Sequence, residues 1–300
     1  MKVIFIHGIN QQNLDKHTFK THWQNVVSLG LHKNDLELDH TKTMLEFPFY
    51  GDILTQYNLK NAINLDTMKP HWNFLDRLAH LHPHKKLNND ILPILPHYQY
   101  DIKMGLRERF FQFSQMTKDR ALKEMVILLN HFPNFHESLV EKFIAEAYLY
   151  WYQATFRHAI HTRIKACFDP KEKHIVVAHS LGTIVAYNLL HELSADYQIE
   201  RFITLASPLP FNVVQKNIKA PMSRPHGLHG DWYNFYSKDD YLTTFPMSPP
   251  LFDFEPRVHN KLITTFVDKP HEIIGYLQHP SVIRCIFNQT SALQPNSDIF

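Results

Sequence analysis

Short apolar runs alternate with helix-length segments in two separate parts of the chain. Near the N-terminus, residues 2–6 predict a buried strand, about 15–29 a helix and 41–47 a second strand. The alternation returns after residue 173, with a final helix near 272–278 and strands expected at 174–178, 201–205, 232–236 and 262–267. Strands that alternate with helices indicate an α/β fold with a mostly parallel central sheet flanked by helices.

Between about residues 52 and 170 the strand signals disappear, and apolar stripes at helical spacing replace them. Residues 121, 122, 125, 126 and 129, for example, share one face of a predicted helix. We therefore expect two core segments, 1–51 and 171–300, separated by a large helical insertion over 52–170. The insertion is either a cap over a site or a second layer of core. Its proline-rich part, 88–100, is the better candidate for a mobile lid.

The segment "HIVVAHSLGTIVAYNLL", residues 174–190, places a serine where a buried strand gives way to a helix. In a nucleophile elbow, a strained backbone makes the serine hydroxyl project from the top of the sheet, and small residues are required two positions away on each side. Ala178 and Gly182 occupy those positions around Ser180. The alternative is an ordinary strand-to-helix junction with Ser180 near a helix N-cap.

A catalytic serine needs a base to take its proton and an acid to hold the tautomer of that base. On a parallel sheet these groups belong at the carboxyl ends of strands. In known enzymes with a nucleophile elbow of this kind, their order along the chain is serine, acid, histidine. Asp239 and Asp240 directly follow the strand at 232–236, whereas Asp231 precedes it and Asp253 lies in a proline-rich segment. The spacing favours Asp239 or Asp240 as the acid, although a solvated turn is the alternative.

Three histidines downstream are candidates for the base. His259 precedes the strand at 262–267 and belongs at its amino end, and His279 falls late in or after the last helix. His271 follows the strand across a short loop and opens the helix, which is where a catalytic histidine is expected. The sequence therefore predicts His271 as the base, with an exposed loop histidine as the alternative.

Two backbone amides are expected to form an oxyanion hole. One belongs to Leu181 at the helix start, where the helix dipole also stabilises negative charge. The other belongs to Ile9 in the loop after the first strand, where Gly8 lets the backbone turn close to the site. His7 and His179 flank the site, and we expect them to stiffen the loops through hydrogen bonds. Two histidines are too few for a catalytic zinc site.

Composition narrows the class of protein. The 300 residues are 44% hydrophobic with a net charge of +2, which gives no bias toward nucleic acid. The two cysteines, Cys167 and Cys285, form neither a disulfide framework nor a metal-binding spacing. The N-terminus resembles no signal peptide, and no apolar run is long enough to span a membrane, so a cytoplasmic protein is expected. Five further histidines without carboxylate or cysteine neighbours are expected at the surface: His80, His82, His84, His158 and His161.

Taken together, these motifs resemble the α/β-hydrolase superfamily, in its serine lipase and esterase branch. "VIFIHGI" resembles the first strand and oxyanion loop of that family, and "VVAHSLG" resembles its elbow. "FITLASPL" is similar to the segment that follows the elbow in lipases of the GPI-inositol-deacylase-like and lecithin–cholesterol-acyltransferase-like kind. The resemblance covers about residues 1–50 and 173–290, and it excludes the helical insertion.

Two further segments carry the resemblance to the site residues. "WYNFYSKDDYL" resembles a Trp-x-Asn-x-Tyr-x-x-x-Asp segment of these lipases, and this likeness implies Asp240 rather than Asp239 as the acid. "DKPHEIIGYLQHPSV" resembles their terminal histidine segment, with Tyr276 further from the histidine than is usual. The resemblance thus implies a triad of Ser180, Asp240 and His271.

The implied activity is hydrolysis of carboxylic esters, including lipid esters, through an acyl-enzyme and without a cofactor or metal. A thioesterase, amidase or acyltransferase uses the same triad, and a non-catalytic binding protein on a hydrolase fold is the alternative from a different class. The expected partner is a small-molecule or lipid ester, with transient membrane contact left open and no signal for an oligomeric state.

Overall fold

The computed structural model describes residues 1–8, 14–56, 146–147, 149–151, 153–218, 222–240, 245–265 and 270–287. The chain divides into two compact units, one made of Met1–Ile53 and Arg157–Phe300 and the other of Leu54–Phe156. The first unit contains the central sheet and the predicted site residues. The lid predicted at 88–100 and most of the predicted insertion lie outside the described residues.

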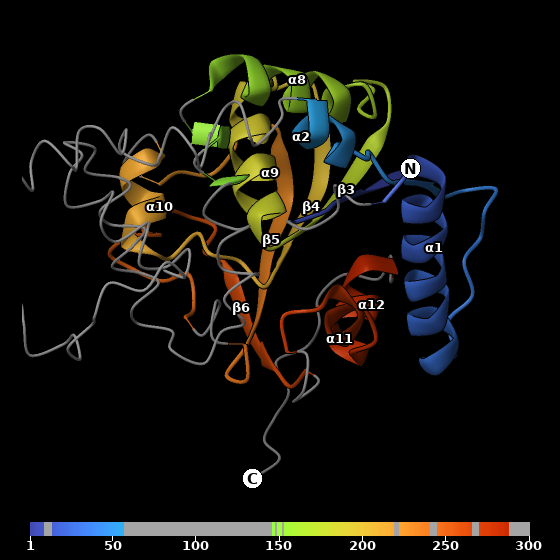
Figure 1. Cartoon of the computed structure of the whole chain (residues 1–300). Coiled ribbons are helices and arrows are strands. Elements are labelled where there is room, and N and C mark those ends of the chain that lie inside the picture. The colour runs from blue at the N-terminus through green and yellow to red at the C-terminus, as the bar shows by residue number, and fades with distance from the viewer. Residues whose placement is uncertain are drawn as a thin grey trace, which may run out of the picture. The chain divides into compact units, whose positions relative to one another are not determined.

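A six-stranded sheet in the order β2-β1-β3-β4-β5-β6 forms the centre of the first unit, and all its strand pairs are parallel (Figure 1). The expected α/β fold with a parallel sheet is therefore confirmed. The strands are β1 (Lys2–Ile6), β2 (Met44–Glu46), β3 (Lys173–His179), β4 (Gln198–Leu205), β5 (Leu228–Ser237) and β6 (His259–Ile263). Strand β1 lies between β2 and β3 in the sheet. The chain passes from β1 to β2 on one side of β1, and the next strand, β3, pairs with β1 on its other side. Such a switch in strand order opens a crevice at the carboxyl ends of β1 and β3.

Helices cover both faces of this sheet. The helices among the described residues are α1 (Lys16–Lys33), α2 (Gly51–Gln56), α8 (Ala154–Lys165), α9 (Leu181–Glu192), α10 (Asn212–Asn217), α11 (Ile273–Leu277) and α12 (Pro280–Phe287). In Figure 1, α1 lies beside α11 and α12 on one side of the sheet, and α9 lies on the other. Val3 and Phe5 of β1 belong to the core under α1, α11 and α12, and the alternate residues Ile4 and Ile6 are equally buried. Burial on both faces explains why the strands are continuous apolar runs.

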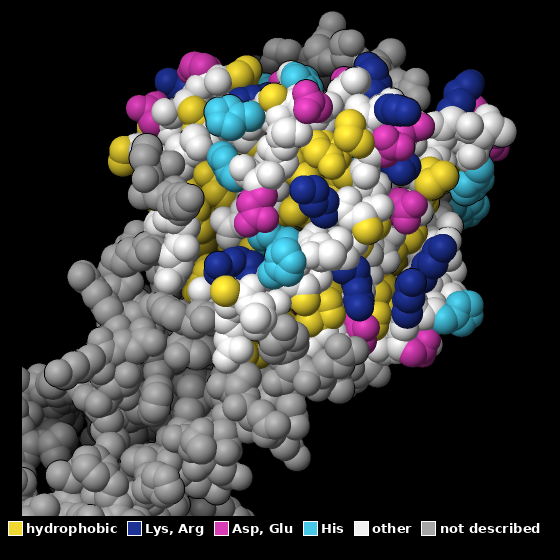
Figure 2. All heavy atoms as spheres, turned by 90° about the horizontal axis from the view of Figure 1, so that it is seen from above, with side chains coloured by type: hydrophobic (Ala, Val, Ile, Leu, Met, Phe, Trp, Pro, Cys, Tyr) yellow, Lys and Arg dark blue, Asp and Glu magenta, His cyan; other side chains and the backbone are white. Residues whose placement is uncertain are grey.

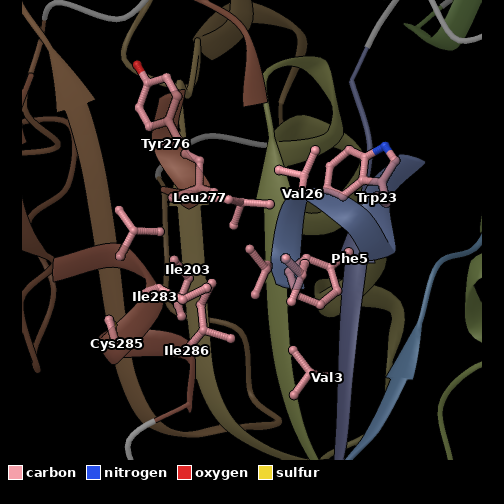
Figure 3. Close-up of a cluster of buried hydrophobic side chains, with 14 of the residues drawn as sticks. Val3, Phe5, Trp23, Val26, Ile203, Tyr276, Leu277, Ile283, Cys285 and Ile286 are labelled. Carbon is pink, nitrogen blue, oxygen red and sulfur yellow. The ribbon is translucent and has the colours of Figure 1, made fainter. Parts of the chain in front are cut away.

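The core between the sheet and α1 is built from aromatic and aliphatic side chains that meet at close range. Figure 3 shows Trp23 and Val26 of α1 next to Phe5 of β1, with Leu277 and Ile283 from the C-terminal helices beside them. The Phe5 ring also stacks on Phe47, with ring centroids 5.0 Å apart. This apolar layer holds the helices that follow β6 against the sheet.

Most helices and strands lie where the hydrophobic pattern predicts them, but the residues at which they begin and end differ from the predicted ones. Helix α1 continues to Lys33, past the expected end at residue 29, and β6 begins at His259 rather than at 262. Two short helices, α10 and α12, were not anticipated, whereas α2 falls at the start of the segment predicted to be helical. Helices this short are formed mainly by tertiary packing, because their sequences span too few turns for a clear periodic signal.

The prediction that His161 is a surface residue is wrong. His161 is buried, and its Nδ1 lies 2.8 Å from Oε2 of Glu192. The side chain therefore has a carboxylate partner, which the neighbouring sequence does not supply. The partner belongs to α9, 31 residues away, and spacing along the chain carries no signal for that contact. His158 is exposed as expected, whereas His80, His82 and His84 lie outside the described residues.

Charged side chains of both signs intermingle on the face of the molecule shown in Figure 2, with histidines among them. Over its described residues, this face has no single-sign patch that would attract a polyanion. Within the same part of the chain, none of the helices combines the length and the apolar character needed to cross a lipid bilayer.

A methyl group at Gly30 tests the contact between α1 and α11. A Cβ there would lie 2.2 Å from the carbonyl oxygen of Leu277, and a backbone atom moves less readily than a side chain. We expect Gly30→Ala to lower the free energy of unfolding by about 1–2 kcal/mol, since the clash outweighs the better helix propensity of alanine. Urea unfolding measures the effect. The exposed α1 residue Ser28, changed to Ala, is the control, and equal stability of the two variants would contradict the close packing.

Candidate active site

Ser180 sits in the turn between β3 and α9 with a φ of 54° and a ψ of −130°. A positive φ is uncommon for a residue with a Cβ, and the surrounding structure must hold it. The Ser180 amide donates to the carbonyl oxygen of Leu205 at 3.0 Å, and its own carbonyl accepts the Thr183 amide at 2.9 Å. Ser180 occupies the N-cap position of α9, yet its side chain makes no capping hydrogen bond. Ser180 therefore lies at the N-cap position without capping the helix, in a sharp turn between β3 and α9 that we refer to below as the elbow.

Close approach of β1 explains the small residues around this turn. A Cβ at Gly182 would lie 2.3 Å from the carbonyl oxygen of His7 and 2.6 Å from that of Ile6. A Cβ at Gly8 would lie 2.7 Å from the Cβ of Ser180. All three distances are far shorter than van der Waals contact. Glycine at positions 8 and 182 therefore lets the end of β1 pass directly against the turn.

Ser180, His271 and Asp240 form one chain of hydrogen bonds. The Nε2 atom of His271 lies 2.8 Å from Oγ of Ser180, and its Nδ1 atom lies 3.0 and 2.9 Å from Oδ1 and Oδ2 of Asp240. An ionised carboxylate only accepts, so Nδ1 carries the proton and Nε2 is free to accept the serine hydroxyl. The exposed fractions are 1% for Ser180, 9% for His271 and 0% for Asp240.

The ends of the parallel strands bring these three side chains together. Ser180 directly follows β3, Asp240 comes three residues after β5 ends at Ser237, and His271 comes two residues before α11 begins at Ile273. Residues 31 and 91 positions apart along the chain thus meet at one edge of the sheet.

The other sequence candidates lie elsewhere. Asp239 is half-buried, and its amide donates to Oγ of Ser237 at 3.2 Å, while the carboxylate that reaches His271 is that of Asp240. Asp231 pairs with His259, with 3.5 Å between Oδ1 and Nε2. That pair lies toward the amino ends of β5 and β6, away from Ser180.

The two remaining alternatives take no part in the chain of hydrogen bonds at Ser180. Asp253 is exposed in the loop that precedes β6. His279 accepts the Ser281 amide on Nδ1 at 3.2 Å at the start of α12.

His7 and His179 hold the loops around the site through backbone hydrogen bonds. His7 accepts the Tyr50 amide on Nε2 at 3.1 Å, so its Nδ1 carries the proton and donates to the Gly8 carbonyl at 2.8 Å. His179 donates its Nε2 proton to the backbone carbonyl of His271 at 3.0 Å. One histidine thus orders the loop after β1, and the other ties β3 to the segment that carries His271.

Burial keeps both of these histidines neutral. Loss of hydration lowers the pKa of His7 and of His179 to about 3, from an ordinary value of 6.5. For His179, the neighbouring His271 lowers the pKa further. Two neutral imidazoles therefore flank the hydrogen-bonded chain over the physiological pH range.

Of the two expected oxyanion donors, one is described. Leu181 is the first residue of α9, where backbone amides point out of the helix end without an intrahelical acceptor. Ile9 lies outside the described residues. Gly8, the residue before it, approaches closely enough that a Cβ there would be 3.3 Å from Oγ of Ser180.

Sequence reasoning missed a layer of polar groups behind the elbow. The Thr183 hydroxyl donates to the Ser180 carbonyl at 2.8 Å, and the Ser207 hydroxyl lies 2.8 Å from that of Thr183. Both hydroxyls are buried. The one signal in the sequence is that Ser207 follows the end of β4, the strand next to the elbow strand.

A series of polar side chains joins three neighbouring strands and explains the Trp-x-Asn pattern of β5. Trp232 donates its indole N–H to the Thr204 hydroxyl at 3.2 Å, and that hydroxyl lies 3.0 Å from Oδ1 of Asn234. Asn234 in turn donates to Oδ1 of Asn260 at 3.0 Å. These contacts join β4 to β5 and β6, and the chain continues from β5 to Asp240 and from β6 to His271.

Comparison of the chain with protein-family models and with curated proteins finds no match. The case for a function therefore rests on the side-chain geometry described above.

The two buried histidines predict a loss of stability in acid. Each binds a proton near pH 6.5 when unfolded and only near pH 3 when folded, so the unfolded state binds more protons between these values. We expect the free energy of unfolding to fall as the pH drops below 6.5, by up to about 1.4 kcal/mol per pH unit for each histidine.

Urea unfolding at several pH values tests this in the wild type and in His179→Gln, whose amide still donates to a carbonyl. The pH slope of the variant is expected to be smaller by about one proton. His158→Gln, which replaces an exposed histidine, is the control. Equal slopes for wild type and His179→Gln would contradict a buried neutral His179.

Proposed function

We propose that this protein is a serine hydrolase that cleaves carboxylic esters through Ser180, His271 and Asp240. The observation that carries the proposal is the unbroken chain of hydrogen bonds from the Ser180 hydroxyl through the His271 ring to the Asp240 carboxylate. Nucleophile, base and orienting acid at such distances are the minimum machinery for acyl transfer.

In the proposed reaction, Oγ of Ser180 attacks the ester carbonyl carbon while its proton moves to Nε2 of His271. Asp240 stabilises the resulting imidazolium through its bond to Nδ1–H and does not take the proton itself. The tetrahedral intermediate then collapses, the ester C–O bond breaks, and Nε2 returns the proton to the departing alcohol. A water molecule repeats the sequence on the acyl-enzyme, which releases the acid and restores the serine hydroxyl.

The proposed oxyanion hole consists of the backbone amides of Leu181 and Ile9. Leu181 at the N-terminus of α9 supports this assignment, because both the amide and the helix dipole favour negative charge there. The loop after β1 starts beside Oγ of Ser180, which supports a contribution from Ile9 as the second donor.

The topology supports an α/β-hydrolase fold for the first unit. Nucleophile, acid and base follow β3, β5 and β6, in the chain order serine, aspartate, histidine that is typical of this superfamily. We extend the proposal to its lipase and esterase branch, with a small-molecule or lipid ester as substrate and the insertion over 52–170 as a cap.

Two costs of this arrangement favour catalysis over a binding scaffold. A strained serine backbone costs on the order of 1–3 kcal/mol. A fully buried aspartate loses its hydration and must be compensated by hydrogen bonds. A protein that only binds a ligand on this fold gains nothing from either feature, whereas a nucleophile elbow with an oriented base requires both.

The direct test removes the nucleophile. We expect Ser180→Ala to lower ester turnover by about 10³-fold or more, because no other group in the chain of hydrogen bonds attacks carbon. The measurement is a p-nitrophenyl ester series from acetate to palmitate, in parallel with fluorophosphonate labelling. Ser28→Ala, an exposed position, serves as the matched control. A wild-type protein that neither turns over an ester nor reacts with the fluorophosphonate would refute the proposal.

Adjacent aspartates provide a second test with a built-in control. Asp240→Asn removes the charge bonded to His271 and favours the wrong tautomer, so kcat is expected to fall by about 10³–10⁴-fold. Asp239→Asn makes the same chemical change one residue earlier, where the carboxylate does not contact the histidine, and kcat should stay close to the wild-type value. Steady-state kinetics on both folded variants measures the two values of kcat. A larger loss of kcat in Asp239→Asn than in Asp240→Asn would assign Asp239 as the acid instead.

A further inference from the structure

A tyrosine hydroxyl contacts the acid of the proposed triad in addition to the base. The hydroxyl of Tyr276 donates to Oδ2 of Asp240 at 2.7 Å, and the same oxygen lies 2.9 Å from Nδ1 of His271. Tyr276 and Asp240 are both completely buried. A hydrogen bond to a carboxylate that has lost its hydration is charge-assisted and strong.

The position of Tyr276 in the fold determines where its hydroxyl lies. Figure 3 shows the tyrosine at the margin of the apolar core next to Leu277, with the hydroxyl directed away from the aliphatic side chains. Helix α11 carries Tyr276 five residues after His271. The same short segment therefore supplies both the base and a second partner for the acid, and packing of the ring in the core fixes the hydroxyl.

We propose that Tyr276 is a positioning residue, whose hydroxyl holds the Asp240 carboxylate in the orientation that keeps the His271 proton on Nδ1. The inference rests on the proposed hydrolase function. By sharing the negative charge of Oδ2, the hydroxyl also moderates the attraction between Asp240 and the His271 imidazolium. The base is then able to release its proton to the leaving group.

The other titratable groups near His271 do not replace this contact. His179 donates to the His271 backbone carbonyl rather than to its ring, and burial lowers the His179 pKa to about 3, so it brings no charge at neutral pH. Glu272 is the next residue along the chain, and it is exposed. Among the described residues, the Asp240 carboxylate is the charged group that contacts Nδ1, and the Tyr276 hydroxyl bonds that same carboxylate.

Tyr276→Phe removes the hydroxyl and keeps the ring in the core. We expect kcat to fall by about tenfold to a hundredfold, in line with loss of a hydrogen bond to a charged group, while KM stays within about twofold. The acidic limb of the pH profile of kcat/KM should move to higher pH, because the full charge of Asp240 then holds the His271 proton more tightly.

Tyr187→Phe is the matched control. Tyr187 is also buried and also loses one bonded hydroxyl, since its OH donates to the Ser223 carbonyl at 3.2 Å, but it lies on α9 away from Asp240. If Tyr276→Phe lowers kcat and moves the acidic limb no more than Tyr187→Phe does, the hydroxyl has a structural role only and the inference fails.

A third variant keeps the shape of the tyrosine side chain and is expected to move the acidic limb of the pH profile in the opposite direction. Replacing Tyr276 by 3-fluorotyrosine keeps the hydroxyl and makes it a stronger donor, so the acidic limb should move to lower pH. This variant keeps the inference testable if Tyr276→Phe folds poorly. An unmoved acidic limb in the fluorinated protein would overturn the inference.

NMR titration of the His271 ring separates this inference from the proposed function, because it requires no turnover. A His271 pKa that rises in Tyr276→Phe and not in Tyr187→Phe supports the contact, and an unchanged His271 pKa overturns it. Failure of the hydrolase proposal instead appears in the wild type, as absence of both ester turnover and fluorophosphonate labelling.

Discussion

The close approach of β1 to the turn between β3 and α9 is the constraint on which the site depends. Side chains at positions 8 and 182 would overlap with Ser180 and with the His7 carbonyl, so glycine is required at both. With the backbones this close, the turn is held in a conformation with positive φ that an isolated chain avoids. The strain at Ser180 is thus balanced by the packing of the parallel sheet around it.

A second requirement is the accommodation of charge inside this packed structure. Asp240 is fully buried, and two groups that bond its carboxylate, His271 and Tyr276, come from the segment that follows β6. That segment is held in place by the apolar core under α1 and by the bond from His179 to the His271 backbone. The hydrophobic core and the polar chain are therefore coupled, since displacement of α11 would separate the base and the tyrosine from the acid at once.

Much of this arrangement was predictable from local pattern. The parallel sheet followed from strands that alternate with helices. Ser180, the adjacent Asp239 and Asp240, and His271 were singled out because each follows a predicted strand, and only the family resemblance favoured Asp240 over Asp239. The bond between His161 and Glu192, the hydroxyl pair of Thr183 and Ser207, and the contact of Tyr276 with Asp240 were not predictable. Each joins side chains on different elements, and no periodicity along the chain reports which helix packs against which.

The amino-acid sequence by itself determined the order of strands and helices and the residues at strand ends where reactive groups gather. Apolar runs and small residues at turns act locally, so their effect is visible in a short stretch of chain. Only the tertiary structure decided that Asp240 rather than Asp239 bonds His271, that His7 and His179 are buried and neutral, and that Tyr276 reaches the acid. Those outcomes depend on distances of a few ångströms between segments far apart in sequence, which packing sets and local pattern does not encode.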